Sequence, residues 1–153
     1  MVVDIHANVD DSKLLKLVSS TLYKPVALSA LIAEDNPANQ KIVKLLLKEL
    51  GLESVCVDNG RRAVDSFRQG GFDVVIMDIN MPELGGIEAA KLINEYEKVN
   101  FLGHTPIIAL TAYAIKGDSE RFMEAGMDDY LAKPVTIDIM RETLEKHLKD
   151  GKK

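Results

Sequence analysis

Short runs of apolar residues alternate with longer segments of helical periodicity along most of this 153-residue chain. The apolar runs are LSALIA (28–33), a stretch near 54–58, FDVVIM (72–77), PIIAL (106–110) and DDYLA (128–132). Helical segments follow them at about 37–50, 60–69, 87–96, 115–125 and 136–149. Strands that are apolar on both faces and separated by helices predict a parallel sheet with helices on both sides. The expected fold class is therefore α/β, with a doubly wound five-stranded sheet.

The first strand-helix unit shows how the sequence marks a helix. Pro37 suits the first helical position, and Asn36 before it is a good N-cap. Apolar residues then recur at spacings of three and four, which predicts one buried stripe made of Ile42, Val43, Leu46, Leu47 and Leu50. Gly51 is placed to end the helix, and the last helix has a similar stripe of Ile139, Met140, Leu144 and Leu148. Five such units predict a flavodoxin-like (βα)5 sheet with strand order 2-1-3-4-5.

Length and composition predict one domain. A chain with 46% apolar and 28% charged residues can bury one sizeable core at this length, and we expect that domain to cover residues 28–150. Residues 1–27 are expected to be an extension or linker. Leu14, Leu15, Val18 and Leu22 share one helical face there, so a short appended helix and a frayed linker are both compatible with the sequence.

Charge and cysteine content narrow the function classes. The net charge of −5 argues against a nucleic-acid partner, which usually requires a basic patch. The single cysteine, Cys56, has no partner for a disulfide and is expected to be a small core residue in a reducing compartment. No apolar run approaches the roughly 20 residues that span a bilayer. We therefore expect a cytoplasmic protein without direct membrane contact.

Four of the expected strands end on residues with useful chemistry. Glu34 and Asp35 follow the first strand, Asp78 the third, Thr111 the fourth and Lys133 the fifth. Because ligands of open parallel sheets bind at the carboxyl ends of the strands, these side chains should meet at one edge. Taken singly, each has a structural explanation in helix capping, turn chemistry or surface solvation. Their coincidence at one edge favours a functional site.

Carboxylates gathered at one edge repel one another unless a cation neutralises them. Oxygen-only ligands suit Mg²⁺, which is the expected cofactor, while Lys133 adds a positive charge and Thr111 a hydroxyl. A carboxylate nucleophile with these partners suggests phosphoryl transfer through an acyl phosphate. Asp78 stands alone at its strand end and is the preferred nucleophile. Glu34 and Asp35 are the preferred metal ligands.

Four separated motifs carry a family resemblance: LIAEDNPANQKIV, VVIMDINMPELGG, PIIALTAYA and GMDDYLAKPV. With these motifs the chain from about 29 to 149 resembles the response-regulator receiver domains of two-component phosphorelays, and looks most like the receivers of hybrid sensor histidine kinases. The resemblance implies a phosphoprotein that takes a phosphoryl group from a sensor histidine kinase or a histidine phosphotransfer protein. It also implies that the domain catalyses its own phosphorylation and dephosphorylation while acting mainly in signalling.

Position by position, the resemblance makes Asp78 the phospho-acceptor. It implies a metal shell of Glu34, Asp35, Asp78 and the backbone carbonyl of Asn80. Lys133 would contact the phosphoryl group, and the Lys133–Pro134 peptide bond would be cis. Thr111 and Tyr130 match the switch pair. The responsive surface would be formed by the helix expected at 115–125, the strand at 128–132 and the helix at 136–149, and the protein would be a monomer or a weak dimer through that face.

The loop after Asp78 departs from the family pattern. After Met81 and Pro82 the pattern often has two residues and then Asp-Gly, whereas this chain reads Glu83, Leu84, Gly85, Gly86. The missing carboxylate is expected to alter this loop but not the metal site.

Three other functions are compatible with parts of this pattern. A phosphorylation-independent pseudo-receiver would need only the fold. A haloacid dehalogenase-type phosphatase usually has a second aspartate where this chain has Asn80. A flavin or dinucleotide module would need a glycine-rich turn where the chain reads AEDNPAN. His147 is expected to be a solvated terminal residue, and His104 is assigned no role.

Overall fold

The computed structural model describes residues 27–112 and 117–148. Its five strands form one parallel sheet in the order β2-β1-β3-β4-β5, which confirms the predicted fold class and strand order. The elements are β1 (Leu28–Ala33), α2 (Pro37–Glu49), β2 (Leu52–Val57), α3 (Gly60–Arg68), β3 (Val74–Asp78), α4 (Gly86–Val99), β4 (Ile107–Thr111), α5 (Asp118–Glu124), β5 (Asp129–Ala132) and α6 (Ile137–Leu148). No helix in these ranges is long and apolar enough to cross a membrane.

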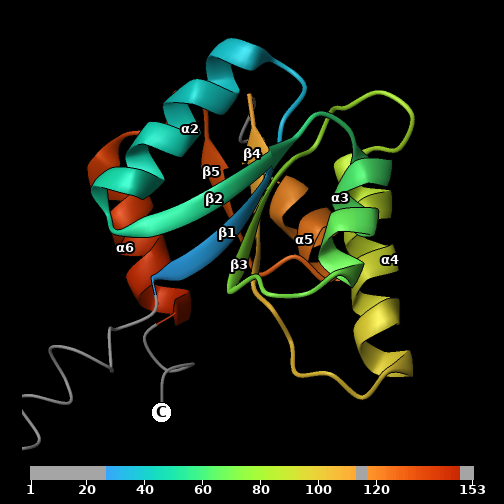
Figure 1. Ribbon diagram of the computed structural model, residues 1–153. Coiled ribbons are helices and arrows are strands. Elements are labelled where there is room, and N and C mark those ends of the chain that lie inside the picture. The colour runs from blue at the N-terminus through green and yellow to red at the C-terminus, as the bar shows by residue number, and fades with distance from the viewer. Residues whose placement is uncertain (1–26, 113–116, 149–153) are drawn as a thin grey trace, which may run out of the picture.

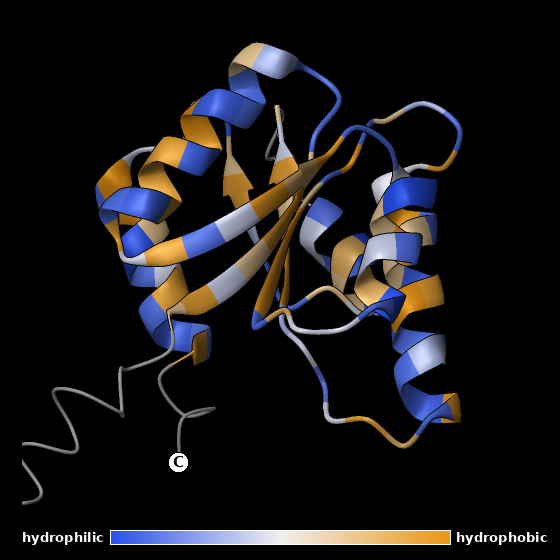
Figure 2. Ribbon diagram, viewed as in Figure 1, coloured by the Kyte–Doolittle hydropathy of each residue, from blue (hydrophilic) through white to orange (hydrophobic). Residues whose placement is uncertain are grey.

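Helices cover both faces of the sheet, so the domain has three layers (Figure 1). Helices α2 and α6 lie on one face, and α3, α4 and α5 lie on the other. Each face has its own apolar core, and every residue of the central strand β3 is buried. Figure 2 shows that the helices carry both hydrophobic and hydrophilic residues, and the buried ones pack against the sheet in the two cores. Fully burying one large apolar side chain contributes about 1.5–3 kcal/mol, so these two cores hold the strand ends in place.

Helix α2 begins at Pro37, as predicted, and Asn36 caps it by accepting a hydrogen bond from the backbone N–H of Asn39 at 3.0 Å. Gly51 follows the helix with φ +88°, a backbone conformation that favours glycine. One residue of the buried stripe predicted for α2 is not buried. Val43 and Leu47 are buried, but Ile42 is 48% exposed because it lies at the margin of the stripe. Ile139 of α6 was also predicted to lie in a buried stripe and is exposed instead.

Several predicted boundaries differ from the structure. Strand β2 begins at Leu52, before the stretch predicted near 54–58, and β3 begins at Val74 rather than at residue 72. Of the helix predicted over 115–125, the described part begins at Asp118. Residues 113–116 lie outside the described ranges, as does the helix suggested near the amino terminus. Cys56, which was expected in the core, is only half-buried.

Candidate functional site

The strand register brings the predicted residues to one edge of the sheet. In the paired strands, Ala33 lies beside Met77, Asp78 beside Leu110 and Thr111 beside Ala132. The carboxyl edge is therefore shared by the residues at and just after these positions, namely Glu34, Asp35, Asp78, Thr111 and Lys133.

Three carboxylates form the centre of this edge. Glu34, Asp35 and Asp78 each place one oxygen within 4.8 Å of the others. Glu34 is fully buried and Asp78 is 4% exposed, whereas Asp35 faces solvent. A set of oxygen donors suits a hard divalent cation, while Zn²⁺ sites usually include nitrogen or sulfur donors. The cluster can therefore hold a metal of the kind predicted from the sequence.

The buried Glu34 carboxylate has one oxygen that fits a cation. Its Oε2 accepts a hydrogen bond from the backbone N–H of Asn36 at 3.0 Å. Its Oε1 forms an ion pair with the Lys133 ammonium at 2.8 Å and has no further hydrogen-bond partner among the described residues. Because the same ammonium also pairs with Asp78, a bound cation would further stabilise the negative charge at this oxygen.

Lys133 lies between the two buried carboxylates. Its ammonium is 2.8 Å from Glu34 Oε1 and 3.4 Å from Asp78 Oδ1. Burial lowers the pKa of Lys133, but the hydrogen bond to Glu34 and the negative charges of Asp78 and Glu34 outweigh it, so the pKa is raised. The lysine is therefore charged at neutral pH. It provides part of the compensation that the sequence analysis assigned to a metal.

The two buried carboxylates differ in their pKa. Burial, followed by the charge of Glu34, raises the pKa of Asp78 from 3.8 to about 6 against the opposing charge of Lys133. Burial also acts to raise the pKa of Glu34, but hydrogen bonds from Lys133 and from the Asn36 N–H hold it below its usual value. Asp78 thus carries most of the electrostatic cost of the cluster. A divalent cation would remove that cost by favouring the ionised form.

Thr111 and Tyr130 occupy the places expected of them on β4 and β5. Thr111 is buried at the end of β4, on the strand beside Asp78, and its carbonyl accepts a hydrogen bond from the Lys133 N–H at 2.8 Å. Tyr130 lies on β5 with its ring exposed, 6.1 Å from the ring of Phe122 in α5. The Lys133–Pro134 peptide bond is cis. A change at Asp78 could therefore reach β5 through the backbone contact between Thr111 and Lys133.

The loop after Asp78 forms one wall of the site. The Asn80 N–H donates to Asp78 Oδ1 at 3.2 Å, which fixes the orientation of the carboxylate. A groove of about 700 Å³ runs from Asp35 and Asn80 to Lys91 of α4 and Arg121 of α5. The site is therefore open to solvent beside Asp35, on the side where a second molecule could approach.

The departure from the family pattern falls on the N-cap of α4. Gly85 occupies that position and makes no side-chain capping bond. The loop is closed instead by the backbone: the Gly86 N–H donates to the Ile79 carbonyl at 3.0 Å. A Cβ on Gly86 would lie 2.1 Å from the Asp78 carbonyl oxygen, so this close approach requires glycine.

Two supporting contacts were not predicted from the sequence. Gln40 donates from Nε2 to the Glu34 carbonyl at 2.6 Å, and Gly60 donates from its backbone N–H to the Leu84 carbonyl at 3.1 Å. Gln40 lies one helical turn after the N-cap Asn36, and this spacing is the one sequence feature that could have indicated the contact with Glu34. The Gly60 contact joins the start of α3 to the loop before α4, and no periodic pattern in the sequence indicates it.

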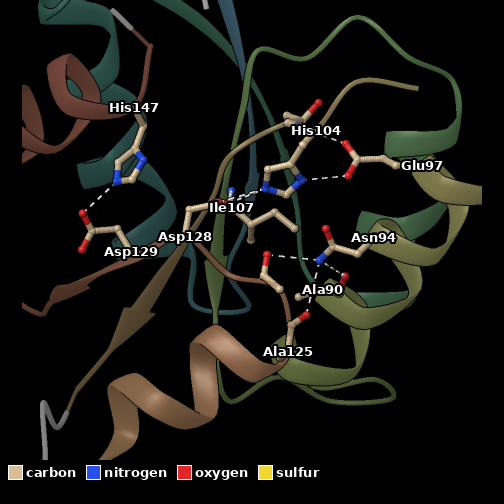
Figure 3. A network of polar contacts seen from close by, with 11 residues as sticks. Ala90, Asn94, Glu97, His104, Ile107, Ala125, Asp128, Asp129 and His147 are labelled. Atoms are coloured by element: carbon tan, nitrogen blue, oxygen red, sulfur yellow. Dashed lines mark hydrogen bonds and ion pairs between the residues drawn. The ribbon is translucent and has the colours of Figure 1, made fainter. Parts of the chain in front are cut away.

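The two histidines among the described residues, His104 and His147, belong to other polar contacts (Figure 3). His104 bridges two carboxylates, with Nδ1 3.0 Å from Glu97 Oε1 and Nε2 2.8 Å from Asp128 Oδ2. These residues precede β4 and β5, at the amino edge of the sheet. His147 was predicted to be solvated, but its side chain is mostly buried and pairs with Asp129 at 2.9 Å. His104 and His147 therefore both have structural contacts.

Comparison with known proteins supplies the family context. A family model described as the response regulator receiver domain matches residues 30–145. Hybrid signal transduction histidine kinase I of Dictyostelium discoideum is 43% identical over 119 residues, which are 74% of this chain and 7% of that kinase. The polar-differentiation response regulator DivK of Brucella anthropi is 37% identical over 123 residues, which are 80% of this chain and 98% of DivK.

Two solved structures are similar in fold and in sequence. One is the receiver domain of a sensor histidine kinase from Pseudomonas aeruginosa, with a magnesium ion coordinated in its active site cleft. Its TM-score is 0.73 at 36% identity, covering 81% of this chain and 99% of that one. The other is the receiver domain of Ssk1 from Saccharomyces cerevisiae, in complex with the histidine phosphotransfer protein Ypd1. Its TM-score is 0.75 at 32% identity, covering 83% and 94%.

Proposed function

This chain belongs to the response regulator receiver domain family, and from that premise we propose that Asp78 accepts a phosphoryl group from a phosphohistidine, with Mg²⁺ as the cofactor. The observation that carries the proposal is the position of Asp78. Its carboxylate lies in a cluster with Glu34 and Asp35 and has the Lys133 ammonium 3.4 Å away. A carboxylate nucleophile, an acidic metal site and a fixed cation are the parts that phosphoryl transfer to aspartate requires.

The residues that would hold the metal are Glu34, Asp35, Asp78 and the carbonyl of Asn80. The clustering of Glu34, Asp35 and Asp78 and the raised pKa of Asp78 both support a cation at this position. When bound, Mg²⁺ would neutralise the carboxylates and the oxygens of the incoming phosphoryl group.

The transfer step forms a bond between an Asp78 oxygen and phosphorus and breaks the bond between phosphorus and the donor histidine nitrogen. The nitrogen keeps the electron pair of the broken bond. Lys133 is positioned to balance the charge of the transferred group, because its ammonium already contacts Asp78 Oδ1. The Asn80 N–H holds the same oxygen, so the carboxylate is oriented before the donor arrives.

The response to phosphorylation would pass through Thr111 and Tyr130. The phosphorylated side chain would carry about −1.5 to −2 charge beside Lys133, more than the single charge of the carboxylate it replaces. We expect the Thr111 hydroxyl to turn toward that charge and the exposed ring of Tyr130 to move inward beside Phe122. The surface that changes would be α5, β5 and α6, where Met123 is also exposed. The protein would be a monomer or would form a weak dimer through that surface.

The proposed donor is a sensor histidine kinase or a histidine phosphotransfer protein in the cytoplasm. The Ssk1 receiver is solved with such a phosphotransfer protein, and this chain offers an apolar surface beside its own site. Ile42 and Leu45 of α2 are 48% and 58% exposed, and Ile42 lines a small cavity shared with Glu34 and Lys133. We propose that a donor helix packs on these two residues and brings its phosphohistidine to Asp78.

Phosphoryl transfer to the purified chain tests this function. Incubation with labelled phosphotransfer proteins, or with acetyl phosphate, should label the wild type only when Mg²⁺ is present. Hydroxylamine should release the label, because it cleaves acyl phosphates. The Asp78→Asn variant should fold and remain unlabelled.

The outcomes separate the alternatives. Labelling of Asp78→Asn at the wild-type rate would show that another residue is the nucleophile. A wild type that binds no Mg²⁺ and accepts no label from any donor would be a pseudo-receiver. Comparing transfer rates across a panel of phosphotransfer proteins would identify the class of donor.

A further inference from the structure

We propose that Gly60 is a positioning residue for the phosphorylation site, because it braces the loop 79–85 that follows Asp78. The inference rests on the proposed function, since this loop carries the Asn80 carbonyl that would bind the metal. Gly60 is the first residue of α3, on the strand-helix connection after β2. It touches neither the metal site nor a substrate, and would act through the loop.

The contact between Gly60 and the loop is a close approach of two backbones. The Gly60 N–H donates to the Leu84 carbonyl at 3.1 Å. A Cβ built on Gly60 would lie 2.1 Å from that oxygen and 2.8 Å from the Leu84 carbonyl carbon, distances that real Cβ atoms essentially never show. Any side chain at residue 60 would therefore push the Leu84 carbonyl away and break the hydrogen bond.

The backbone conformation of Gly60 does not by itself require glycine. Its φ lies outside the left-handed region, and alanine is a better residue than glycine in a helix. The close approach to Leu84 is thus the physical reason for glycine here. Without it, Gly60→Ala would be expected to stabilise α3.

The loop transmits this contact to the site because it is short and closed at its base. The Gly86 N–H bonds the Ile79 carbonyl at 3.0 Å, and the Ile79 N–H bonds the Leu110 carbonyl of β4 at 3.1 Å. These bonds fix the two ends of the loop against β3 and β4. Leu84 lies near the end of the connection to α4, directly before the N-cap Gly85, which makes no side-chain capping bond.

The missing cap gives the Gly60 contact its importance. Gly85 stands where a capping carboxylate would hold the start of α4. The carbonyl of the preceding residue, Leu84, instead accepts a hydrogen bond from the first residue of α3. Glu83 adopts φ +66° directly before Leu84, a conformation that is uncommon for a residue other than glycine and needs support from its surroundings. The hydrogen bond from Gly60 to Leu84 supplies such support. By fixing the loop, it keeps the Asn80 carbonyl and the Asn80 N–H in position around Asp78.

The test compares Gly60→Ala with Gly103→Ala. Gly103 lies in the loop before β4, and a Cβ there would have no atom within 4 Å. Its φ is also outside the left-handed region, so an alanine fits without strain and the variant is a matched control. Mg²⁺ is titrated against each protein while the NMR signals of the Ile79 and Asn80 amides are followed. Gly60→Ala should weaken Mg²⁺ binding about tenfold or more, as loss of a supporting contact does in other metal sites, and Gly103→Ala should leave it unchanged.

A purely structural role gives a different result. If Gly60→Ala changes the melting temperature but binds Mg²⁺ within about twofold of the wild type, the inference is overturned while the proposed function stands. If the wild type shows no Mg²⁺-dependent shift at Asn80, both the proposed function and the proposed role of Gly60 are contradicted.

A measurement on the wild type covers the case in which Gly60→Ala does not fold. Coupling between two sites is reciprocal. If the hydrogen bond between Gly60 and Leu84 aids Mg²⁺ binding, Mg²⁺ binding must therefore stabilise that hydrogen bond. Hydrogen exchange of the Gly60 amide should therefore slow when Mg²⁺ is added, while the Gly103 amide should exchange at the same rate. An unchanged exchange rate at Gly60 would overturn the inference.

Discussion

The Lys133 ammonium lies 3.4 Å from the Asp78 carboxylate, and the two groups come from the ends of β5 and β3 with β4 between them. The same ammonium is 2.8 Å from Glu34. One cation thus serves two buried carboxylates, and the site is balanced only in part before a metal binds. Because one positive charge faces two buried negative charges, substitutions at this site should change the stability of the protein as well as its activity.

Replacing Lys133 with methionine should destabilise the metal-free protein. The change leaves Glu34 and Asp78 buried without their cation, and breaking such a pair costs about 3 kcal/mol. Mg²⁺ should restore much of this loss, so it should stabilise Lys133→Met more than it stabilises the wild type. Urea unfolding with EDTA and with saturating Mg²⁺ measures both effects.

Lys146→Met is the matched control. Its ammonium pairs with Asp129 at 3.5 Å, but the side chain is 69% exposed, so its loss should change the free energy of unfolding by less than about 1 kcal/mol. Equal effects of the two substitutions would show that Lys133 does not neutralise the buried carboxylates.

Asp78→Asn should stabilise the metal-free protein at neutral pH. Burial, followed by the charge of Glu34, raises the pKa of Asp78 from 3.8 to about 6. An acid with a raised pKa in the folded state favours folding while protonated, so this contribution is complete below about pH 3.8 and is lost as the pH rises through about 6. The advantage of the variant should therefore reach up to about 3 kcal/mol above pH 6 and shrink below it.

Urea unfolding in EDTA at about pH 4 and about pH 7.5 tests this sign. Asp138→Asn is the control, because Asp138 is an exposed residue paired with Arg141. A difference between Asp78→Asn and wild type that does not change with pH would mean that the Asp78 carboxylate is not strained in the folded protein. Added Mg²⁺ should stabilise the wild type and not the variant.

The sequence predicted the site because parallel topology leaves few choices. Once FDVVIM and PIIAL are recognised as neighbouring parallel strands, Asp78 and Thr111 must lie at the same edge. The sequence did not predict contacts between elements whose relative positions depend on packing. The contact between Gly60 and Leu84 depends on how closely α3 approaches a loop, and the exposure of Ile42 depends on where the margin of a buried stripe falls.

The polar network at the amino edge was missed for the same reason. Glu97, His104 and Asp128 each resemble solvated surface residues in the sequence, and they meet only because the loop before β4 passes between α4 and the start of β5 (Figure 3). Glu97 is buried and also accepts the Thr105 N–H at 2.7 Å. Both ring nitrogens of His104 face carboxylates, so the doubly protonated ring fits the network.

His104→Gln should therefore destabilise the protein more at low pH than at high pH. Burial lowers the pKa of His104, but the hydrogen bonds and charges of Asp128 and Glu97 outweigh it and raise the pKa above 6.5. A raised histidine pKa stabilises the fold below about pH 6.5, and this stabilisation is lost as the pH rises through the folded-state value.

Because the ring is half exposed, the difference should be at most about 1 kcal/mol. Urea unfolding at about pH 6 and about pH 9 measures it, and an NMR titration of the His104 ring gives the pKa directly. A cost of His104→Gln that is the same at both values of pH would mean that the ring does not bind the two carboxylates as a cation.

Gly85→Asn should stabilise the protein slightly. Gly85 is the N-cap of α4 and has an extended backbone, φ −72° and ψ 166°, that any residue can adopt. An asparagine there can accept a hydrogen bond from the first turn of α4, which is worth a few tenths of a kcal/mol over glycine, or about 2 °C in melting temperature. Gly103→Asn lies outside any helix and should give no such gain, so equal shifts in the two variants would exclude capping as the cause.

Ile42→Ser and Leu45→Ser should slow phosphoryl transfer from a protein donor without slowing labelling by acetyl phosphate. Both side chains lie on α2, and Ile42 borders the cavity that reaches Lys133. Each is about half exposed, so its loss should cost the fold little, whereas a docked helix would lose apolar contact worth about 1–2 kcal/mol per residue. The transfer rate at subsaturating donor should then fall about tenfold.

Val99→Ser separates docking from a general loss of surface hydrophobicity. Val99 is 67% exposed at the end of α4, beyond the amino edge of the sheet and away from Asp78. It should leave transfer from the phosphotransfer protein unchanged, because a donor over α2 does not reach it. Equal slowing by all three variants would place the donor elsewhere, and slowing of acetyl phosphate labelling by Ile42→Ser would mean that Ile42 supports the site itself rather than the partner.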